Sequence, residues 1–274
     1  MKANMRDVLG NAKKEHYAVP ATNFIDWNSA KAYSEVSESR KLPLILAYAQ
    51  VHSQYLSLED AAAIGRYFQE VTNTPVVLHL DHGQDFEFIK RAIELGFNSV
   101  MIDASLDTFE ENVRKTKEVV EYAHQFGVDV EAEIGFVGAN AASNNEEVKS
   151  IYTSVEDAKK FVEETNVDSL AVSIGTSHGL YKGTPKLNFE RLEELNEALT
   201  IPLVLHGGSG SGDDNLNRCA THGISKINIY SDFMYSGAKA VADGYVENYV
   251  DIVKLSREGM KETLDHYYNV FETK

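Results

Sequence analysis

Eight short apolar stretches that alternate with helical patterns constrain the fold of this chain more than any other feature. Short apolar runs bounded by glycine or proline predict buried strands, and their alternation with helices is typical of a parallel sheet. The predicted strands are residues 17–24, 42–48, 76–80, 99–102, 128–134, 169–174, 202–205 and 226–230. Eight such repeats in 274 residues favour an α/β fold of the (β/α)8 type, the TIM barrel. A doubly wound open sheet is the alternative, although the glycine-rich fingerprint expected after its first strand is absent.

Helical patterns fill the intervals between these strands and extend the chain at both ends. The predicted helices are residues 5–14, 28–40, 57–71, 86–95, 109–125, 155–165, 189–198, 213–222, 232–250 and 256–271. The barrel should therefore carry an extra N-terminal helix and C-terminal helices. Residues 135–150 are rich in Gly, Ala, Asn and Ser, which predicts a long loop after the fifth strand. No linker or change of composition divides the sequence, so we expect residues 1–274 to form one domain.

Charge and composition limit the partners that the protein can bind. Acidic residues outnumber basic ones 42 to 26, which gives a formal net charge of −16. Nucleic acids and anionic membranes attract basic surfaces, so we expect neither as a partner. The single cysteine, Cys219, excludes an internal disulfide and a thiolate metal cluster within one chain. No apolar run is long enough to span a membrane and no signal-peptide pattern is present, which predicts a soluble cytoplasmic protein.

Three histidines follow the ends of three different predicted strands: His82, His178 and His206. In a TIM barrel the carboxyl ends of all strands meet at one face, where the active sites of such barrels lie. The barrel would therefore bring together three imidazoles that are far apart in the sequence. Three neutral nitrogen ligands leave one coordination position open, the arrangement of a catalytic zinc site. Asp81 directly precedes His82 and would be costly to bury without a metal ion or another partner.

A glycine-rich turn, Gly-Gly-Ser-Gly at 207–210, follows the seventh predicted strand. Backbone N–H groups in such a turn, next to a helix N-terminus, form a common binding site for phosphate. The eighth strand adds the amide of Asn228 and the hydroxyl of Ser231, and Lys182 could add a positive charge. Phosphate sites after the seventh and eighth strands recur in TIM barrels, so this end of the barrel is predicted to bind an anionic group.

The other histidines are predicted to be structural. His79 lies within the third strand, where we expect it to be packed and hydrogen-bonded, and His52 falls in a loop after the second strand. The remaining four, on predicted helices, at helix ends or before the first strand, are His16, His124, His222 and His266.

Taken together, these motifs resemble the class II, zinc-dependent ketose-bisphosphate aldolases, in particular the branch of fructose- and tagatose-bisphosphate aldolases. The resemblance covers nearly the whole chain. It rests on residues 17–21, 79–82, 99–105, 130–135, 168–172, 178–181 and 204–210. It implies a lyase that forms a homodimer or homotetramer and holds a monovalent cation, Na⁺ or K⁺, near the substrate phosphate.

The resemblance also implies a role for each site residue. The three histidines match the zinc ligands, and Asp81 matches the acid/base that exchanges a proton with the hydroxyl on the cleaved carbon. Asp103 and Glu133 match carboxylates near the metal. The residues expected to bind substrate are Asn23, Gly179, Lys182, Gly207, Gly208, Ser209, Asn228 and Ser231.

The chemistry of ketose cleavage agrees with these residue types. Splitting a phosphorylated ketose between C3 and C4 releases an aldehyde and leaves an enediolate on dihydroxyacetone phosphate. A Lewis acid stabilises the enediolate charge without an imine, and a carboxylate beside the metal can take and return the hydroxyl proton. A phosphate grip would fix the ketone fragment against the metal and reduce the entropy cost of alignment.

The sequence departs from the family at three places. The loop after the fifth strand normally carries Gly-Gly and then acidic residues; here Glu146 or Glu147 would have to donate the proton to the enediolate. Many relatives have Asp-Pro-Arg before the last helix, whereas residues 251–253 read Asp-Ile-Val. Because valine cannot bind a phosphate, we expect an aldehyde other than glyceraldehyde 3-phosphate, or one held by different residues. The strand ends at 47–50 and Tyr230 also differ, which indicates a changed pocket.

Three other functions stay open. A Schiff-base aldolase needs a lysine at a strand end, but Lys226 begins its predicted strand and Lys182 lies in a loop. A metal-dependent hydrolase could use the same three histidines. The third alternative is a catalytically impaired barrel that only binds a sugar phosphate, which the altered loop after the fifth strand suggests.

Overall fold

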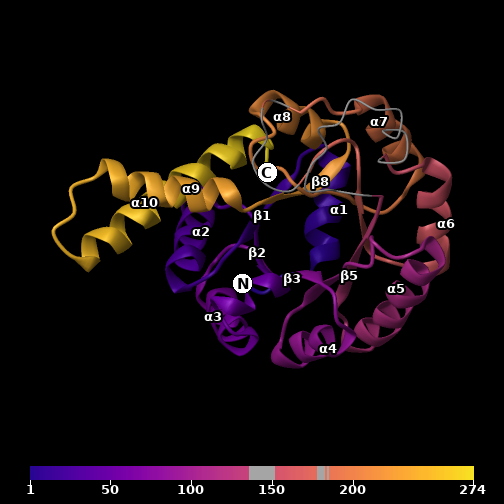
Figure 1. Cartoon of the computed structure of the whole chain (residues 1–274), viewed down its shortest axis with the longest axis horizontal. Helices are drawn as coiled ribbons and strands as arrows, with labels where there is room; N and C mark the ends of the chain where they lie inside the picture. Colours follow the sequence, from indigo (N-terminus) through magenta and orange to yellow (C-terminus); the bar gives the residue numbers. More distant parts are fainter. Residues whose placement is uncertain (136–151, 178–182, 184) are drawn as a thin grey trace.

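Eight parallel strands close into a barrel in the order β1 to β8, with β1 paired to β8, so the predicted TIM barrel is confirmed (Figure 1). The structure is a computed structural model that describes residues 1–135, 152–177, 183 and 185–274. The strands are β1 (Val19–Asn23), β2 (Leu44–Ala49), β3 (Val76–Gly83), β4 (Ser99–Ile102), β5 (Asp129–Ile134), β6 (Ser169–Val172), β7 (Leu203–Leu205) and β8 (Ile224–Ile229).

Helices surround the barrel, and the described part of the chain contains no helix with the length and apolarity needed to cross a membrane. They are α1 (Met5–Glu15), α2 (Trp27–Arg40), α3 (Leu58–Val71), α4 (Phe86–Leu95), α5 (Phe109–Ala123), α6 (Val155–Thr165), α7 (Phe189–Ala198), α8 (Asp213–Thr221), α9 (Ser231–Asp243) and α10 (Tyr249–Val270), with short 3₁₀ helices η1 (Gln50–Gln54) and η2 (His124–Phe126). Polar caps fix several helix starts: the side chains of Ser57, Thr108 and Ser154 each accept the N–H three residues ahead.

The barrel interior changes from apolar to charged along its axis. At the N-terminal end, α1 packs Met5, Val8 and Leu9 against apolar side chains of β1, β2 and β3, and so closes the bottom. Further along, strand residues that are fully buried include charged ones, among them Glu131 and Lys226. Because α1 covers the N-terminal end of the barrel, a cavity that reaches the polar interior is expected at the other end, where the strands terminate.

The boundary between the last two helices differs from the one that the sequence pattern predicted. The break lies between α9 and α10 at residues 244–248, not at 251–255. Gly244 ends α9, and a Cβ there would lie 2.6 Å from the side chain of Leu255. Asn248 then begins α10 in a capping box with Asp251. A glycine followed by this capping pair was therefore the sequence signal for the break.

Two strand boundaries also differ in ways that matter for the site. β3 continues through Asp81 and His82 to Gly83 and does not stop at 80. β8 starts at Ile224, so Lys226 lies inside the strand and not at its beginning. The residue after β2 that was predicted to lie in a loop, His52, belongs to the 3₁₀ helix η1.

Candidate functional site

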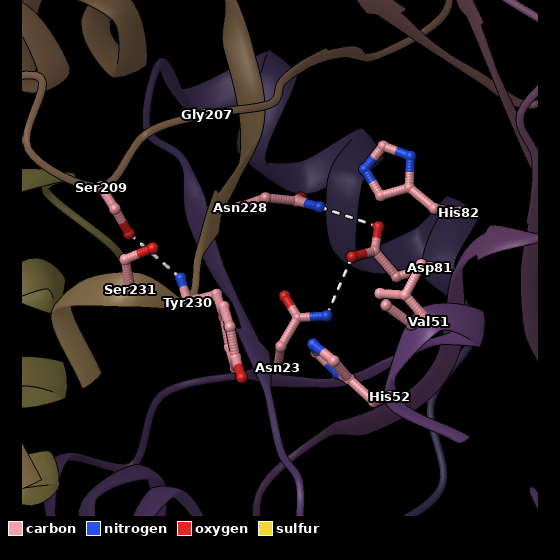
Figure 2. A pocket seen from close by; sticks show the side chains of 11 residues that line it. Asn23, Val51, His52, Asp81, His82, Gly207, Ser209, Asn228, Tyr230 and Ser231 are labelled. Carbon is pink, nitrogen blue, oxygen red and sulfur yellow. Dashed lines mark hydrogen bonds between the residues drawn. The ribbon is translucent and has the colours of Figure 1, made fainter. Parts of the chain in front are cut away.

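A cavity of about 270 Å³ opens at the carboxyl ends of the strands (Figure 2). This volume is near the lower end for pockets that hold small molecules. Its lining comes from β1, β2 with η1, β3, β7 and β8 with the segments that follow them. The lining residues are Asn23, Ala49, Val51, His52, Asp81, His82, Gly207, Ser209, Asn228, Tyr230 and Ser231.

An irregularity at the end of β3 brings Asp81 and His82 to the same cavity. In a regular strand, consecutive side chains point to opposite faces. Here the pairing of β3 with β4 shifts register between Leu80 and Gly83, and His82 has a left-handed backbone with φ of 48°. Such a conformation is uncommon for residues other than glycine and is found most often at functional sites. The irregularity therefore allows both side chains to line the cavity.

Asp81 is buried, and each of its carboxylate oxygens accepts one hydrogen bond. The side-chain amides of Asn23 and Asn228 each donate to one of its carboxylate oxygens, both at 2.9 Å (Figure 2). Burial by itself raises the pKa of Asp81, but the neighbouring His82 and Lys226 outweigh it and hold the pKa well below its usual value. Asp81 is therefore a carboxylate, fixed in position from two strands and able to accept a proton.

His82 is oriented by the carboxylate of Asp103, which directly follows the neighbouring strand β4. Its Nδ1 lies 2.8 Å from Oδ2 of Asp103, which is itself fixed by the hydroxyl of Ser105 at 2.7 Å. Burial lowers the pKa of His82, yet Asp81 and Asp103 reverse this and raise it. A carboxylate behind the imidazole is the support that metal-binding histidines usually have.

His206 lies between two glutamates of β5. Its Nε2 is 2.9 Å from Oε1 of Glu131 and its Nδ1 is 3.0 Å from Oε2 of Glu133. Burial lowers the pKa of the imidazole, but the two carboxylates outweigh burial and raise its pKa to about 10. The ring therefore holds positive charge between the carboxylates, at a point where a cation would be stabilised.

A buried ion pair supports this histidine from below. The ammonium of Lys226 donates to both oxygens of Glu131, at 2.8 and 2.7 Å, and lies 3.2 Å from Nε2 of His79. The Nδ1 of His79 in turn bonds to the hydroxyl of Ser99 at 2.8 Å, as expected for a packed, hydrogen-bonded histidine. Burial and Lys226 lower the pKa of His79 to about 3, so its ring is neutral. Sequence reasoning missed this pair because Lys226 was expected at the start of β8.

The described residues fit a divalent cation. The ligand atoms of Asp81, His82 and His206 all lie within 4.8 Å of one another, and so do those of His82, Asp103 and Glu133. The rings of His82 and His206 are 4.6 Å apart. Imidazole nitrogens with carboxylate oxygens are ligands that zinc accepts. His82, His206, Glu133 and Asp103 are thus brought together at one end of the barrel.

The third predicted metal ligand, His178, lies outside the described residues, and so do Gly179, Lys182, Glu146 and Glu147. The residue before His178 can be placed. A Cβ on Gly207 would lie 2.4 Å from the carbonyl oxygen of Ser177, and Gly207 has a φ of +68°, so only glycine suits this position. The segment that follows β6 therefore lies directly against the turn after His206.

The glycine-rich turn after β7 is partly used by the protein itself. The N–H of Gly208 donates to the carbonyl of Asn228, and the N–H of Gly210 donates to Asp232. Gly207, Ser209 and Ser231 line the cavity, but Gly208 does not. Ser231 begins α9, so an anion here would lie at the positive end of a helix. Hydroxyl groups and the helix N-terminus are thus better placed for an anion than a ring of glycine N–H groups.

The chain matches the family model described as fructose-bisphosphate aldolase class-II over residues 3–274. Fructose-bisphosphate aldolases of Staphylococcus aureus and Staphylococcus epidermidis are 38% and 37% identical to it over 282 residues, covering 98% of this chain and 97% of each relative. Among solved structures, the YdjI aldolase from Escherichia coli is similar with a TM-score of 0.91 and 33% identity, covering 100% of this chain and 98% of that one.

The buried ion pair leads to a stability prediction. Lys226→Met should lower the free energy of unfolding by about 3–5 kcal/mol, because it leaves the charge of Glu131 buried beside one fewer partner. The double variant Lys226→Met/Glu131→Leu should recover most of this loss, since both charges are then absent. Denaturant unfolding followed by circular dichroism measures both. A double variant as unstable as the single one would contradict the electrostatic explanation and indicate a packing defect.

Proposed function

The chain belongs to the class-II fructose-bisphosphate aldolase family, and from this we propose that it is a zinc-dependent aldolase that reversibly cleaves a phosphorylated ketose to dihydroxyacetone phosphate and an aldehyde. The family makes it an aldehyde-lyase; the metal, the substrate and the residue roles are our proposal. The observation that carries the proposal is the hydrogen-bonded carboxylate of Asp81 beside the imidazoles of His82 and His206.

Zinc would be held by His82, His206 and His178, with Glu133 and Asp103 as carboxylate neighbours. When bound, zinc supplies a Lewis acid that stabilises the enediolate formed on the ketone fragment. Glu131 and Asp103 orient the two described imidazoles, which favours one arrangement of the site. A Schiff-base mechanism finds no support at Lys226, because its ammonium is bonded to both oxygens of Glu131 below the cavity.

Asp81 would accept the proton of the C4 hydroxyl during cleavage and return it during condensation. Its low pKa keeps it deprotonated, and the amides of Asn23 and Asn228 hold both oxygens without occupying all their lone pairs. Glu146 or Glu147 would donate a proton to the enediolate, at the carbon that was C3 of the ketose.

The phosphate of the ketone fragment would lie at Ser209, Ser231 and Gly207, next to the N-terminus of α9. Gly208, Gly179, Lys182 and Asn228 complete the proposed binding residues, with Na⁺ or K⁺ as a counter-ion. This places the phosphate and the acid/base at different ends of one cavity, as cleavage in the middle of a ketose requires.

The aldehyde half is proposed to differ from glyceraldehyde 3-phosphate. Residues 251–253 begin α10 with Asp-Ile-Val and provide no cationic side chain for a second phosphate. The side chains of the described cavity residues are likewise neutral or acidic apart from the histidines.

Exposed apolar side chains support a homodimer or homotetramer. The α9–α10 hairpin extends away from the barrel (Figure 1), and its tip exposes Tyr245, Tyr249 and Val250 by 81%, 76% and 55%. Exposed apolar patches of this kind usually mark contacts with another protein. We propose that the hairpin contacts a second copy of the chain, and that residues 1–274 fold as one domain around the barrel.

Metal dependence can be tested without knowing the aldehyde. Exchange of a hydroxymethyl proton of dihydroxyacetone phosphate, on the carbon that becomes C3 of the ketose, with deuterated solvent should fall at least about a hundredfold after chelation and return on adding zinc. His206→Ala should bind less zinc and lose exchange, whereas His222→Ala, at the end of α8, should retain both. Exchange that persists after complete metal removal, or inactivation by borohydride with substrate, would contradict the proposal.

The substrate proposal predicts a preference for one phosphate over two. Cleavage of fructose 1-phosphate or tagatose 1-phosphate should have a higher kcat/KM than cleavage of the matching 1,6-bisphosphates, because the second phosphate would find no cationic partner. Coupled detection of dihydroxyacetone phosphate measures both reactions with one readout. Cleavage of either bisphosphate at ordinary aldolase efficiency would remove the basis for this part of the proposal.

The assembly proposal predicts a change of mass. Light scattering should give two or four times the mass of one chain for the unmodified protein. Tyr245→Ser combined with Tyr249→Ser should shift it towards the monomer, because the tip loses its apolar area. Phe126→Ser, in η2 and 58% exposed, removes a comparable side chain elsewhere and should leave the mass unchanged. A monomeric unmodified protein would refute the assembly.

A further inference from the structure

His52 is buried in the cavity wall with a ring nitrogen that has no hydrogen-bond partner among the described residues. The residue is 6% exposed, it lines the cavity, and its Nδ1 has no hydrogen bond within the described part of the chain. Its backbone is held firmly: the carbonyl of His52 accepts the N–H groups of Tyr55 at 2.8 Å and Leu56 at 3.1 Å. A buried nitrogen without a partner is costly, so this ring is positioned for a hydrogen bond that the described residues do not provide.

The ring of Tyr230 fixes the ring of His52. Their centroids are 4.6 Å apart with an angle of 35° between the planes, and the ring centroid of Tyr48 lies 6.5 Å from that of His52 with its plane at 74°. Tyr230 is itself anchored, because its N–H donates to Ser209 and its carbonyl accepts the N–H groups of Phe233 and Met234 in the first turn of α9. His52 therefore cannot turn freely to satisfy its nitrogen elsewhere.

The position of His52 in the cavity identifies the part of the substrate that it faces. Figure 2 shows Tyr230 between His52 and the end formed by Ser209 and Ser231, where the phosphate is proposed to bind. His52 lies instead on the side of Asp81 and His82, both of which interact with it electrostatically. A group near Asp81 and away from the phosphate end faces the carbons beyond the cleaved bond.

The chemistry of the ring favours a hydroxyl group over an anion. Burial lowers the pKa of His52, and although Asp81 opposes this, the net shift is downward, so the imidazole is uncharged at neutral pH. A neutral imidazole can donate one hydrogen bond and accept another, as hydroxyl recognition requires. The flat face of Tyr230 and the side chain of Val51 offer apolar surface to the carbon chain that carries the hydroxyl.

We propose that His52 determines specificity for the aldehyde half of the substrate: its Nδ1 hydrogen-bonds a hydroxyl group of an uncharged hydroxyaldehyde, and Tyr230 positions the ring. This inference rests on the aldolase function proposed above and adds the class of aldehyde and the residue that selects it.

A pair of matched variants tests this role. His52→Leu keeps the bulk of the side chain and removes its hydrogen-bonding atoms, whereas His52→Gln keeps a donor and an acceptor. Each protein is assayed in condensation of dihydroxyacetone phosphate with glyceraldehyde and with propanal, which has the same carbon chain without hydroxyls. The ratio of the two kcat/KM values does not depend on how much of a sample is folded, because both aldehydes are measured on the same preparation.

The unmodified protein should prefer glyceraldehyde by roughly ten- to a hundredfold, the range expected when a buried polar group would otherwise stay unsatisfied. His52→Leu should reduce this preference to within about threefold, and His52→Gln should retain most of it. An unchanged preference in His52→Leu, with proton exchange at dihydroxyacetone phosphate intact in the unmodified protein, would overturn the role of His52 and leave the aldolase function standing. Absence of that exchange in the zinc-loaded, unmodified protein would overturn both.

Discussion

The buried ion pair between Lys226 and Glu131 is the interaction on which the rest of the site depends. Neither side chain reaches solvent, and each is satisfied only by groups inside the barrel. Glu131 fixes His206 through one oxygen, and Lys226 contacts His79 from the other side. Because a buried charge without its partner is far more costly than the pair, residues on β3, β5, β7 and β8 are confined to one arrangement. The position of His206 thus follows from an ion pair that does not line the cavity.

A second constraint acts at the end of β3. The strand must deliver a carboxylate and an imidazole from consecutive residues, which regular pleating forbids. The register shift and the positive φ of His82 turn both side chains towards the cavity. Asp103, just after β4, then fixes the imidazole of His82 by a hydrogen bond. Backbone strain of about 1–3 kcal/mol persists only where surrounding contacts enforce it. At His82 these contacts are the hydrogen bond to Asp103 and the pairing of Gly83 with Ile102.

The sequence predicted the fold more completely than it predicted the site. The barrel followed from the alternation of apolar strands and helices. Strand ends predicted His82, His206 and Asp81 as site residues, whereas Asp103 and Glu133 were predicted from the family resemblance alone. The ion pair was missed because a shift of two residues in the start of β8 moved Lys226 from a strand end into the interior. His52 was missed for another reason: its burial depends on Tyr230, which is distant in the sequence, and no local pattern encodes that contact.

The charges inside the barrel explain why a cation belongs there. Among the described residues, the carboxylates of Asp81, Asp103, Glu131 and Glu133 face a single ammonium, that of Lys226. The raised pKa values of His82 and His206 are the response of the protein to this excess of negative charge, since each imidazole that binds a proton offsets one carboxylate. A divalent cation that displaces two imidazole protons leaves the net charge of the interior unchanged. The interior would therefore carry the same net charge with two imidazole protons or with one divalent metal, and the same carboxylates would stabilise both states.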